Sequence, residues 1–214
     1  IGNQIAIAAR NGTDPDMNPS LAMVIEKAKQ ANMPNSNIQR AIDRVKDKNA
    51  ATLEEIVYEG YAPGGVALII ETATDNKNRT FPEVRHALTK NGGTVADSGS
   101  VMFQFDRKGV ITVKATGDDA LLAILDAGAT DANEEDEVIE AVTDAKDLMK
   151  VKKAIEEQGL TVEEAELRYV AKNDVPVTDK ETADKIIRIM DALDDLDDVL
   201  NVHSNADFQV DLGE

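Results

Sequence analysis

The pattern of hydrophobic and polar positions changes near residue 50. Before that point hydrophobic residues recur at helical spacing, and Asn18 followed by Pro19 is a typical helix start. The pattern predicts a small helical unit in residues 1–48, in which Arg40 and Arg44 lie together on the polar face of the last helix. The hydrophobic stripe of that helix consists of Ile38, Ala41, Ile42 and Val45.

After residue 50 the pattern indicates strands. Two hydrophobic runs flank the sequence Pro63-Gly64-Gly65, which predicts a hairpin. A helix follows, with Thr80 and Glu83 as an expected capping box and Asn91-Gly92-Gly93 at its end. Its expected buried stripe is Phe81, Val84, Ala87 and Leu88. The segment 100–115 then predicts two strands joined by a turn at Asp106 to Gly109.

From Gly109 to Ala171 the predicted order is β-α-β-β-α-β, which is typical of a ferredoxin-like domain. A linker at Pro176, a capping box formed by Thr178 and Glu181, a helix and a strand over 199–208 follow. We therefore expect an α+β fold with an N-terminal helical domain and two ferredoxin-like α/β sandwich domains, one inserted in the other. The expected limits are 1–50 for the helical domain, 51–108 with 174–214 for the discontinuous α/β domain, and 109–173 for the inserted domain.

Composition narrows the function classes. The chain of 214 residues has no cysteine and two histidines, and neither histidine belongs to a zinc-binding or other catalytic motif. No hydrophobic run approaches the length of a membrane helix. We expect no enzyme activity, cofactor, metal, small-molecule substrate or membrane partner. The acidic clusters 132–137 and 191–198 lack the spacing of a calcium loop, which favours solvated edges over cation or basic-partner binding.

Charge is distributed unevenly along the chain. The formal net charge is -18, yet residues 1–48 contain seven basic and five acidic residues. Cations also gather around the helix that contains Thr80, and cations beside a helix N-terminus favour phosphate binding. The alternative is a solvated helix face whose cations pair with nearby acids. The candidate nucleic-acid ligands are Lys27, Lys29, Arg40, Arg44, Lys77, Arg79, Arg85, His86 and Lys90.

Several segments together identify the chain as similar to a known family. They include "DPDMNPSLAMVIEKAKQANMPNSNIQRAI", "YEGYAPGGVALIIETATDNKNRTFPEVRHALTKNGG" and "GSVMFQFDRKGVI". These segments resemble the YebC/PmpR family of predicted transcriptional regulators, to which the mitochondrial translational activator of cytochrome oxidase subunit I is also similar. Family members begin with a segment rich in lysine and arginine that has no counterpart here, so we expect the helical domain to be truncated.

The resemblance implies three domains, no enzyme activity and a cytoplasmic protein that binds promoter DNA or, in some members, acts on ribosomes. The surface that it implies for nucleic acid consists of Asn76, Asn78, Arg79, Arg85 and His86. One hypothesis is therefore a DNA-binding regulator of transcription. A second is a ribosome-associated translation factor that binds ribosomal RNA, because no base-reading module is evident. A third is an acidic adaptor that does not contact nucleic acid.

Overall fold

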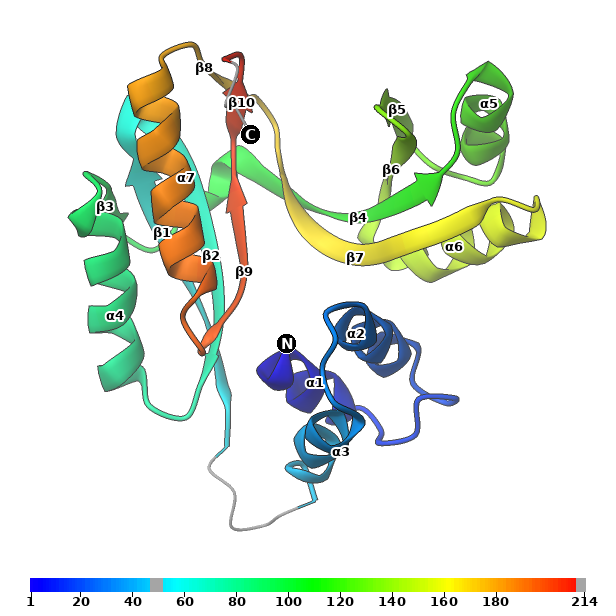
Figure 1. Ribbon diagram of the computed structural model, residues 1–214, viewed down its shortest axis with the longest axis horizontal. Helices are drawn as coiled ribbons and strands as arrows, with labels where there is room; N and C mark the ends of the chain where they lie inside the picture. Colours follow the sequence, from blue (N-terminus) through cyan, green and yellow to red (C-terminus); the bar gives the residue numbers. More distant parts are fainter. Residues whose placement is uncertain (47–51, 211–214) are drawn as a thin grey trace.

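The computed structural model describes residues 1–46 and 52–210, and these residues form a helical unit and two four-stranded antiparallel sheets (Figure 1). Helices cover one face of each sheet, and the predicted α+β class is confirmed. The expected boundary between residues 50 and 51 lies outside the described residues, as does Lys48, and the other domain limits stay predictions.

The helical unit consists of α1 (Gly2–Ala9), α2 (Pro19–Gln30) and α3 (Asn35–Asp43). The side chain of Asn18 accepts a hydrogen bond from the backbone N–H of Leu21, so the predicted start of α2 is confirmed. In the stripe of α3, Ile38 and Ile42 are buried, but Val45 is 39% exposed. The inclusion of Val45 was wrong because α3 ends at Asp43, two residues before Val45.

The outer sheet has the strand order β3-β1-β2-β9, and α4 and α7 cover one of its faces. Its hydrophobic core contains Leu68 and Ile70 of β2, Leu88 of α4 and Ile186 of α7. A short parallel pair, β8 with β10, lies beside it. The elements are β1 (Glu54–Ala62), β2 (Val66–Thr74), α4 (Lys77–Lys90), β3 (Thr94–Ala96), β8 (Val175–Val177), α7 (Lys180–Asp194), β9 (Val199–Ser204) and β10 (Ala206–Phe208).

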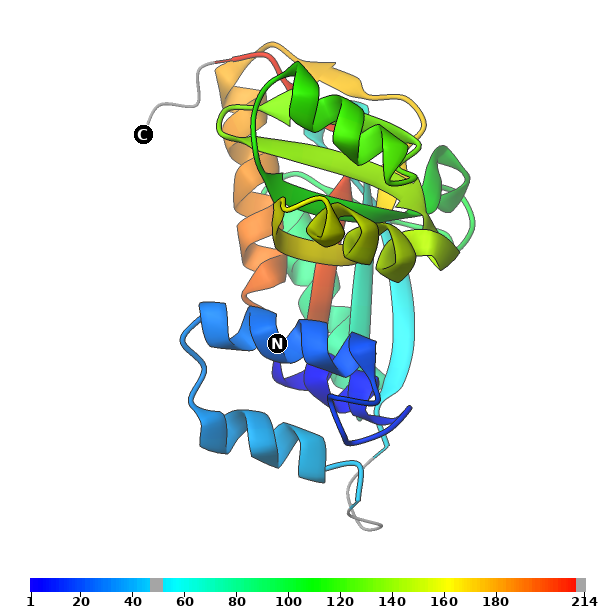
Figure 2. The same ribbon diagram turned by 90° about the vertical axis from the view of Figure 1, so that its right-hand side faces the viewer.

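The inserted sheet has the strand order β5-β6-β4-β7, in which every neighbouring pair is antiparallel. Together with the chain order β-α-β-β-α-β, this arrangement is ferredoxin-like, as the sequence predicted. Figure 2 shows its two helices in front of the sheet. The elements are β4 (Phe105–Lys114), α5 (Asp118–Asp126), β5 (Asp131–Glu135), β6 (Val138–Asp144), α6 (Leu148–Glu157) and β7 (Thr161–Ala171).

Two long strands, β4 and β7, connect the sheets (Figure 1). The predicted turn at Asp106 to Gly109 was wrong, since β4 is continuous and pairs with β7 along its whole length. Three residues form a 3-10 turn before it, η2 (Met102–Gln104). Phe105 at the start of β4 and Ala171 at the end of β7 pack against Ile69 on the second face of the outer sheet.

Both predicted capping boxes were also wrong. The N-cap of α4 is Asn76, and that of α7 is Asp179, whose carboxylate accepts a hydrogen bond from the backbone N–H of Thr182 at 2.9 Å. Side chains such as Asn and Asp cap helices as well as Thr does, so composition alone allowed several starts. Pro176 lies within β8 rather than in a linker, and Asn205 divides the predicted final strand into β9 and β10.

Candidate nucleic-acid interface

Helix α4 carries most of the predicted nucleic-acid ligands. Its first residue follows Asn76, whose side-chain oxygen accepts a hydrogen bond from the backbone N–H of Arg79 at 3.3 Å. Lys77 and Arg79 therefore lie in the first turn of α4, whereas the expected cap at Thr80 would have left them in the loop before the helix. Thr80 is buried, and its hydroxyl lies 2.7 Å from the carboxylate of Asp198, so it faces the protein interior.

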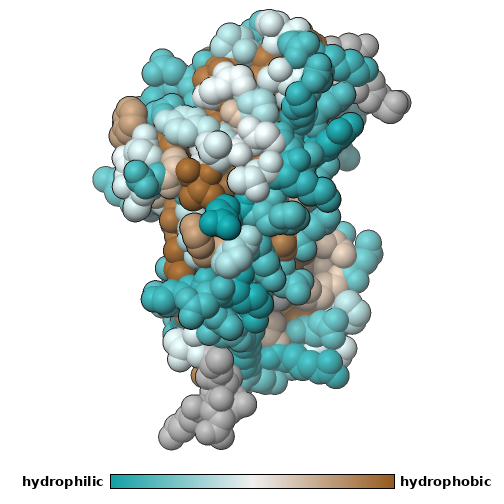
Figure 3. Space-filling model, turned by 90° about the vertical axis from the view of Figure 1, so that its left-hand side faces the viewer, coloured by the Kyte–Doolittle hydropathy of each residue, from teal (hydrophilic) through white to brown (hydrophobic). Residues whose placement is uncertain are grey.

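The buried face of α4 fixes which side chains point outward. Val84, Ala87 and Leu88 are buried as predicted, but Phe81 is 39% exposed. Its ring lies 5.8 Å from the ring of Tyr58 at the border of the sheet, so it belongs to the edge of the core. Polar side chains cover most of the side of the molecule on which α4 lies, with a hydrophobic strip in the middle (Figure 3).

The outer face of α4 is cationic. Within 1–46 and 52–210, no ion pair involves Lys77, Arg85, His86 or Lys90. Glu83 is the one acid on this helix. This face retains positive charge that an external anion can neutralise. Its exposed side chains are Lys77, Asn78, Arg85, His86 and Lys90.

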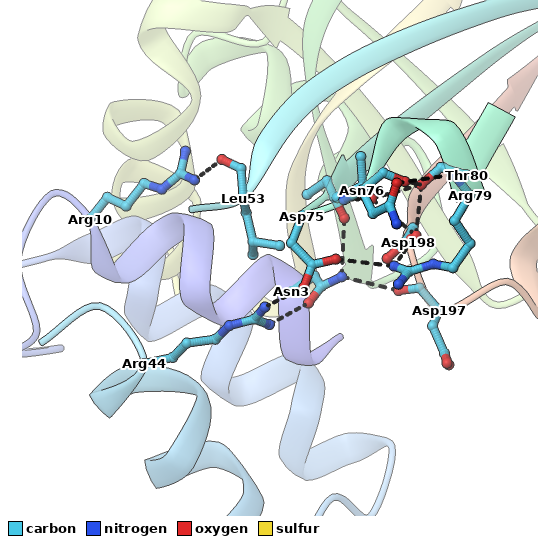
Figure 4. Close-up of polar contacts among 12 residues, drawn as sticks. Asn3, Arg10, Arg44, Leu53, Asp75, Asn76, Arg79, Thr80, Asp197 and Asp198 are labelled. Carbon is cyan, nitrogen blue, oxygen red and sulfur yellow. Dashed lines mark hydrogen bonds and ion pairs between the residues drawn. The ribbon is translucent and has the colours of Figure 1, made fainter. Parts of the chain in front are cut away.

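Arg79 pairs with carboxylates of the protein itself, although its side chain is 47% exposed. Its guanidinium donates hydrogen bonds to Asp198 at 2.8 Å and to Asp75 at 3.2 Å (Figure 4). Burial alone would raise the pKa of Asp198, but the hydrogen bonds from Arg79 and Thr80 and the charge of Arg79 outweigh it, and the pKa is lowered. Arg79 therefore joins the start of α4 to the loop before β9.

Arg44 converges on the same place from α3. Its guanidinium lies 3.6 Å from Asp75 and donates a hydrogen bond to the side chain of Asn3 at 3.3 Å (Figure 4). The structure thus brings together Arg44 and Arg79, as a shared basic surface would require, but it does so around carboxylates. The cleft beside them has a volume of about 520 Å³, and its wall also includes Asp194, Asp195 and Asp197.

The remaining candidates on the helical unit are Lys27, which forms ion pairs, and Lys29 and Arg40, which do not within the described residues. Lys27 lies 2.9 Å from Glu164 and 3.0 Å from Glu166 on β7, so it pairs with the inserted sheet. Burial opposes the charge of Lys27, yet these two glutamates raise its pKa above the ordinary value. Lys29 and Arg40 are exposed and have no ion pair with the described part of the chain.

The sequence patterns did not identify a second polar cluster, at the junction of the two sheets. Glu71 on β2 lies 2.7 Å from the ring of His203 and accepts a hydrogen bond from Arg107 at 2.9 Å. Arg107 also lies over the ring of Tyr169, 5.0 Å from its centroid. Burial would raise the pKa of Glu71, but His203 and Arg107 lower it. No short motif contains these residues, because four different strands supply them.

Among residues 1–46 and 52–210, no group of three or more His, Asp or Glu side chains is arranged to hold a metal ion. None of the helices in these ranges is long and apolar enough to cross a membrane.

Comparison with known proteins places the chain in a family. Residues 1–48 match the family model for the TACO1/YebC protein N-terminal domain, and residues 53–206 match the model for the TACO1/YebC second and third domain.

Curated relatives extend the likeness over nearly the whole chain. A probable transcriptional regulatory protein of Thermobifida fusca is 49% identical over 209 residues, which cover 95% of this chain and 84% of that protein. A protein of the same name from Halothermothrix orenii is 46% identical over 214 residues, covering 97% and 85%.

A solved structure shows the same fold. The crystal structure of a conserved hypothetical protein from Aquifex aeolicus is 40% identical, with a TM-score of 0.89, and the match covers 100% of this chain and 90% of that one. Since the family models and these relatives span both the helical unit and the two sheets, the chain belongs to the YebC/PmpR family, which includes TACO1.

Proposed function

We propose that this protein is a non-enzymatic, cytoplasmic regulator of gene expression that binds duplex DNA through the outer face of α4. The observation that supports the proposal is the set of exposed cations on that one helix, which no described carboxylate neutralises. Phosphate groups are the abundant polyanionic partners of such a surface. The name of the curated relatives, probable transcriptional regulatory protein, agrees with it.

The geometry restricts which residues take part. Lys77, Arg85, His86 and Lys90 can reach a phosphate directly, and Asn78 adds a neutral donor beside them. Lys29 and Arg40 on the helical unit are also exposed and can supply further contacts. Lys27, Arg44 and Arg79 first have to leave their carboxylates, so we assign them to the structure rather than to the ligand. Asn76 caps α4 and takes the same structural role.

A ribosome-associated translation factor that binds ribosomal RNA is the second candidate. One observation favours it: the same molecule has exposed cations on α4 and a strongly acidic inserted domain, where residues 109–173 contain 16 acidic and seven basic residues. Bare duplex DNA repels the acidic part, whereas a ribosome contains both RNA and basic proteins. The two candidates use the same face of α4 and differ in the partner.

Binding across a salt series tests the proposal. The protein is titrated into labelled duplex DNA, a structured RNA of equal length and ribosomes, and the logarithm of the affinity is plotted against the logarithm of the salt concentration. A slope of several with duplex DNA supports the first candidate. A slope that is present with ribosomes and RNA but absent with duplex DNA selects the second. The absence of binding to all three refutes both.

A further inference from the structure

The end of the inserted domain that is formed by α5 and the β5–β6 hairpin is rich in exposed carboxylates. Asp118, Asp119 and Asp126 lie on α5 and are exposed. Residues 131–137 of the hairpin add five more exposed acids. Within the described ranges, none of these eight carboxylates forms an ion pair, although many other acids of the chain do.

Local structure explains few of these charges. Two acids in the first turn of α5 stabilise the helix through its dipole, but Asp126 in the last turn does the opposite. Glu134 accepts a hydrogen bond from the backbone N–H of Gly117 at 2.8 Å, which holds the hairpin beside the start of α5. Asp131 accepts a hydrogen bond from the backbone N–H of Ala132 at 2.9 Å. Among the described residues, the other three hairpin acids have no side-chain hydrogen bond or ion pair.

Two leucines lie on the outer side of the same helix. Leu122 is 60% exposed and Leu125 is 42% exposed, while Ile124 between them is fully buried in the core of the inserted domain. At a spacing of three residues, Leu122 and Leu125 share one face, and Asp118 precedes Leu122 by one turn on that face. Helix α5 therefore has two apolar faces, and the fold uses only one of them.

A leucine pair surrounded by exposed carboxylates indicates what kind of partner it can bind. Such a surface matches a segment that presents apolar side chains in its centre and lysine or arginine around them. A second copy of this chain is a poor occupant, since each copy has a formal net charge of -18 and the copies repel one another. The same net charge attracts a basic protein.

We propose that α5 and the β5–β6 hairpin form a docking surface for a basic amphipathic helix of another protein. Leu122 and Leu125 contact the apolar face of that helix, and the surrounding acids pair with its basic residues. The surface lies at the opposite side of the molecule from α4 (Figure 1), so both can be occupied at once. This inference does not depend on the nucleic-acid proposal.

A synthetic helix of about five turns tests it. The probe has leucines along one face and lysines elsewhere, and its isomer has the same composition with the leucines spread around the helix. Binding of each peptide to the whole protein is measured by calorimetry, and the site is mapped by amide NMR shifts. We expect the amphipathic peptide to bind at least about tenfold more tightly than its isomer, with shifts centred on α5 and the hairpin.

Matched variants locate the contact. L122S and L125S should each weaken binding by roughly tenfold, whereas M17S, at an apolar residue that is 82% exposed on the helical unit, should leave binding unchanged. Circular dichroism melting curves check that each variant is folded. Replacing Glu134 and Glu135 by glutamine should lower the dependence of the affinity on salt.

Four results would overturn the inference. They are equal binding of the two isomers, shifts spread over other acidic surfaces, no binding of either peptide, and leucine variants that bind as well as the original protein. Sedimentation of the protein alone adds a further check. A dimer that L122S abolishes would assign the surface to a second copy and also overturn it.

Discussion

The guanidinium of Arg79 donates a hydrogen bond to the carboxylate of Asp198 at 2.8 Å, although 119 residues separate them in the chain. Arg79 was expected to contact phosphate, and its position in the sequence gives no indication of this partner. The pair connects the first turn of α4 to the loop before β9, so it links two parts of the outer sheet and its helices that the inserted sheet separates in the sequence.

We expect R79A to lower the free energy of unfolding, since the side chain of Asp198, which is only 7% exposed, loses its charged hydrogen-bond donor. R85A, on the outer face of the same helix, should change it by less than about 0.5 kcal/mol. Urea unfolding of the two variants measures the difference. Equal stabilities would show that the pair contributes nothing.

Stability should fall in acid. The pKa of Asp198 and that of Glu71 are both lowered in the folded protein, so folding holds these groups ionised more strongly than the unfolded chain does. The stabilisation is complete above the unfolded pKa, near 4, and is lost as the pH falls from there through the lower folded pKa.

Unfolding free energies measured from pH 7 to pH 2.5 check this acid dependence. The variant D198N should be less stable at pH 7 and should have a shallower loss below pH 4, because one of the two groups no longer titrates. A profile that keeps its full slope in D198N would exclude Asp198 as a source of the effect.

The outer face of α4 should determine the affinity for polyanions. Replacing Arg85 and Lys90 together by alanine removes two exposed cations, and the slope of log affinity against log salt should decrease by about two. The melting temperature should stay nearly constant because neither side chain has an intramolecular ion pair among the described residues.

The matched control replaces Lys146 and Lys150 by alanine. Both are exposed cations of the inserted domain without an ion pair in the described ranges, so the net charge changes equally. If this control weakens binding as much as the α4 variant, the effect comes from total charge and not from a site on α4.

Lys27 should hold the helical unit against β7. K27M keeps an apolar stem of similar length and removes the ammonium group, which leaves Glu164 and Glu166 without their shared partner. We expect faster hydrogen exchange of backbone amides in α2 and β7, corresponding to a loss of about 1 kcal/mol. K29M, at an exposed neighbour, is the control and should exchange as the original protein does.

Gly109 should not tolerate a side chain. A methyl group at this position would overlap the hydroxyl of Thr143 and lie 3.0 Å from the side chain of Leu148. We expect G109A to lower the free energy of unfolding by about 1–3 kcal/mol, measured with urea. G2A, where the added methyl group meets nothing, is the control. An unchanged G109A would mean that α6 moves away without cost.

Gly109 also shows where sequence patterns mislead. Asp106, Arg107, Lys108 and Gly109 together favour a turn, because polar residues and glycine are typical of turns. Pairing with β6 and β7 on both sides keeps the segment extended instead, and the glycine admits the close approach of α6. The two capping boxes failed for a related reason, since several neighbouring residues were able to cap each helix.

The sequence by itself determined the order of elements in the helical unit and in the ferredoxin-like unit, the α+β class and the family, because hydrophobic periodicity and local turn residues act over short distances. Only the tertiary structure decided which cations have no carboxylate partner among the described residues. The sequence alone does not distinguish Lys27, Arg44 and Arg79 from Arg85 and Lys90, since all five are basic residues near predicted helices. In the fold, carboxylates from distant segments neutralise the first three. A charge acts on whatever lies within a few ångströms of it, and only the folded chain determines those neighbours.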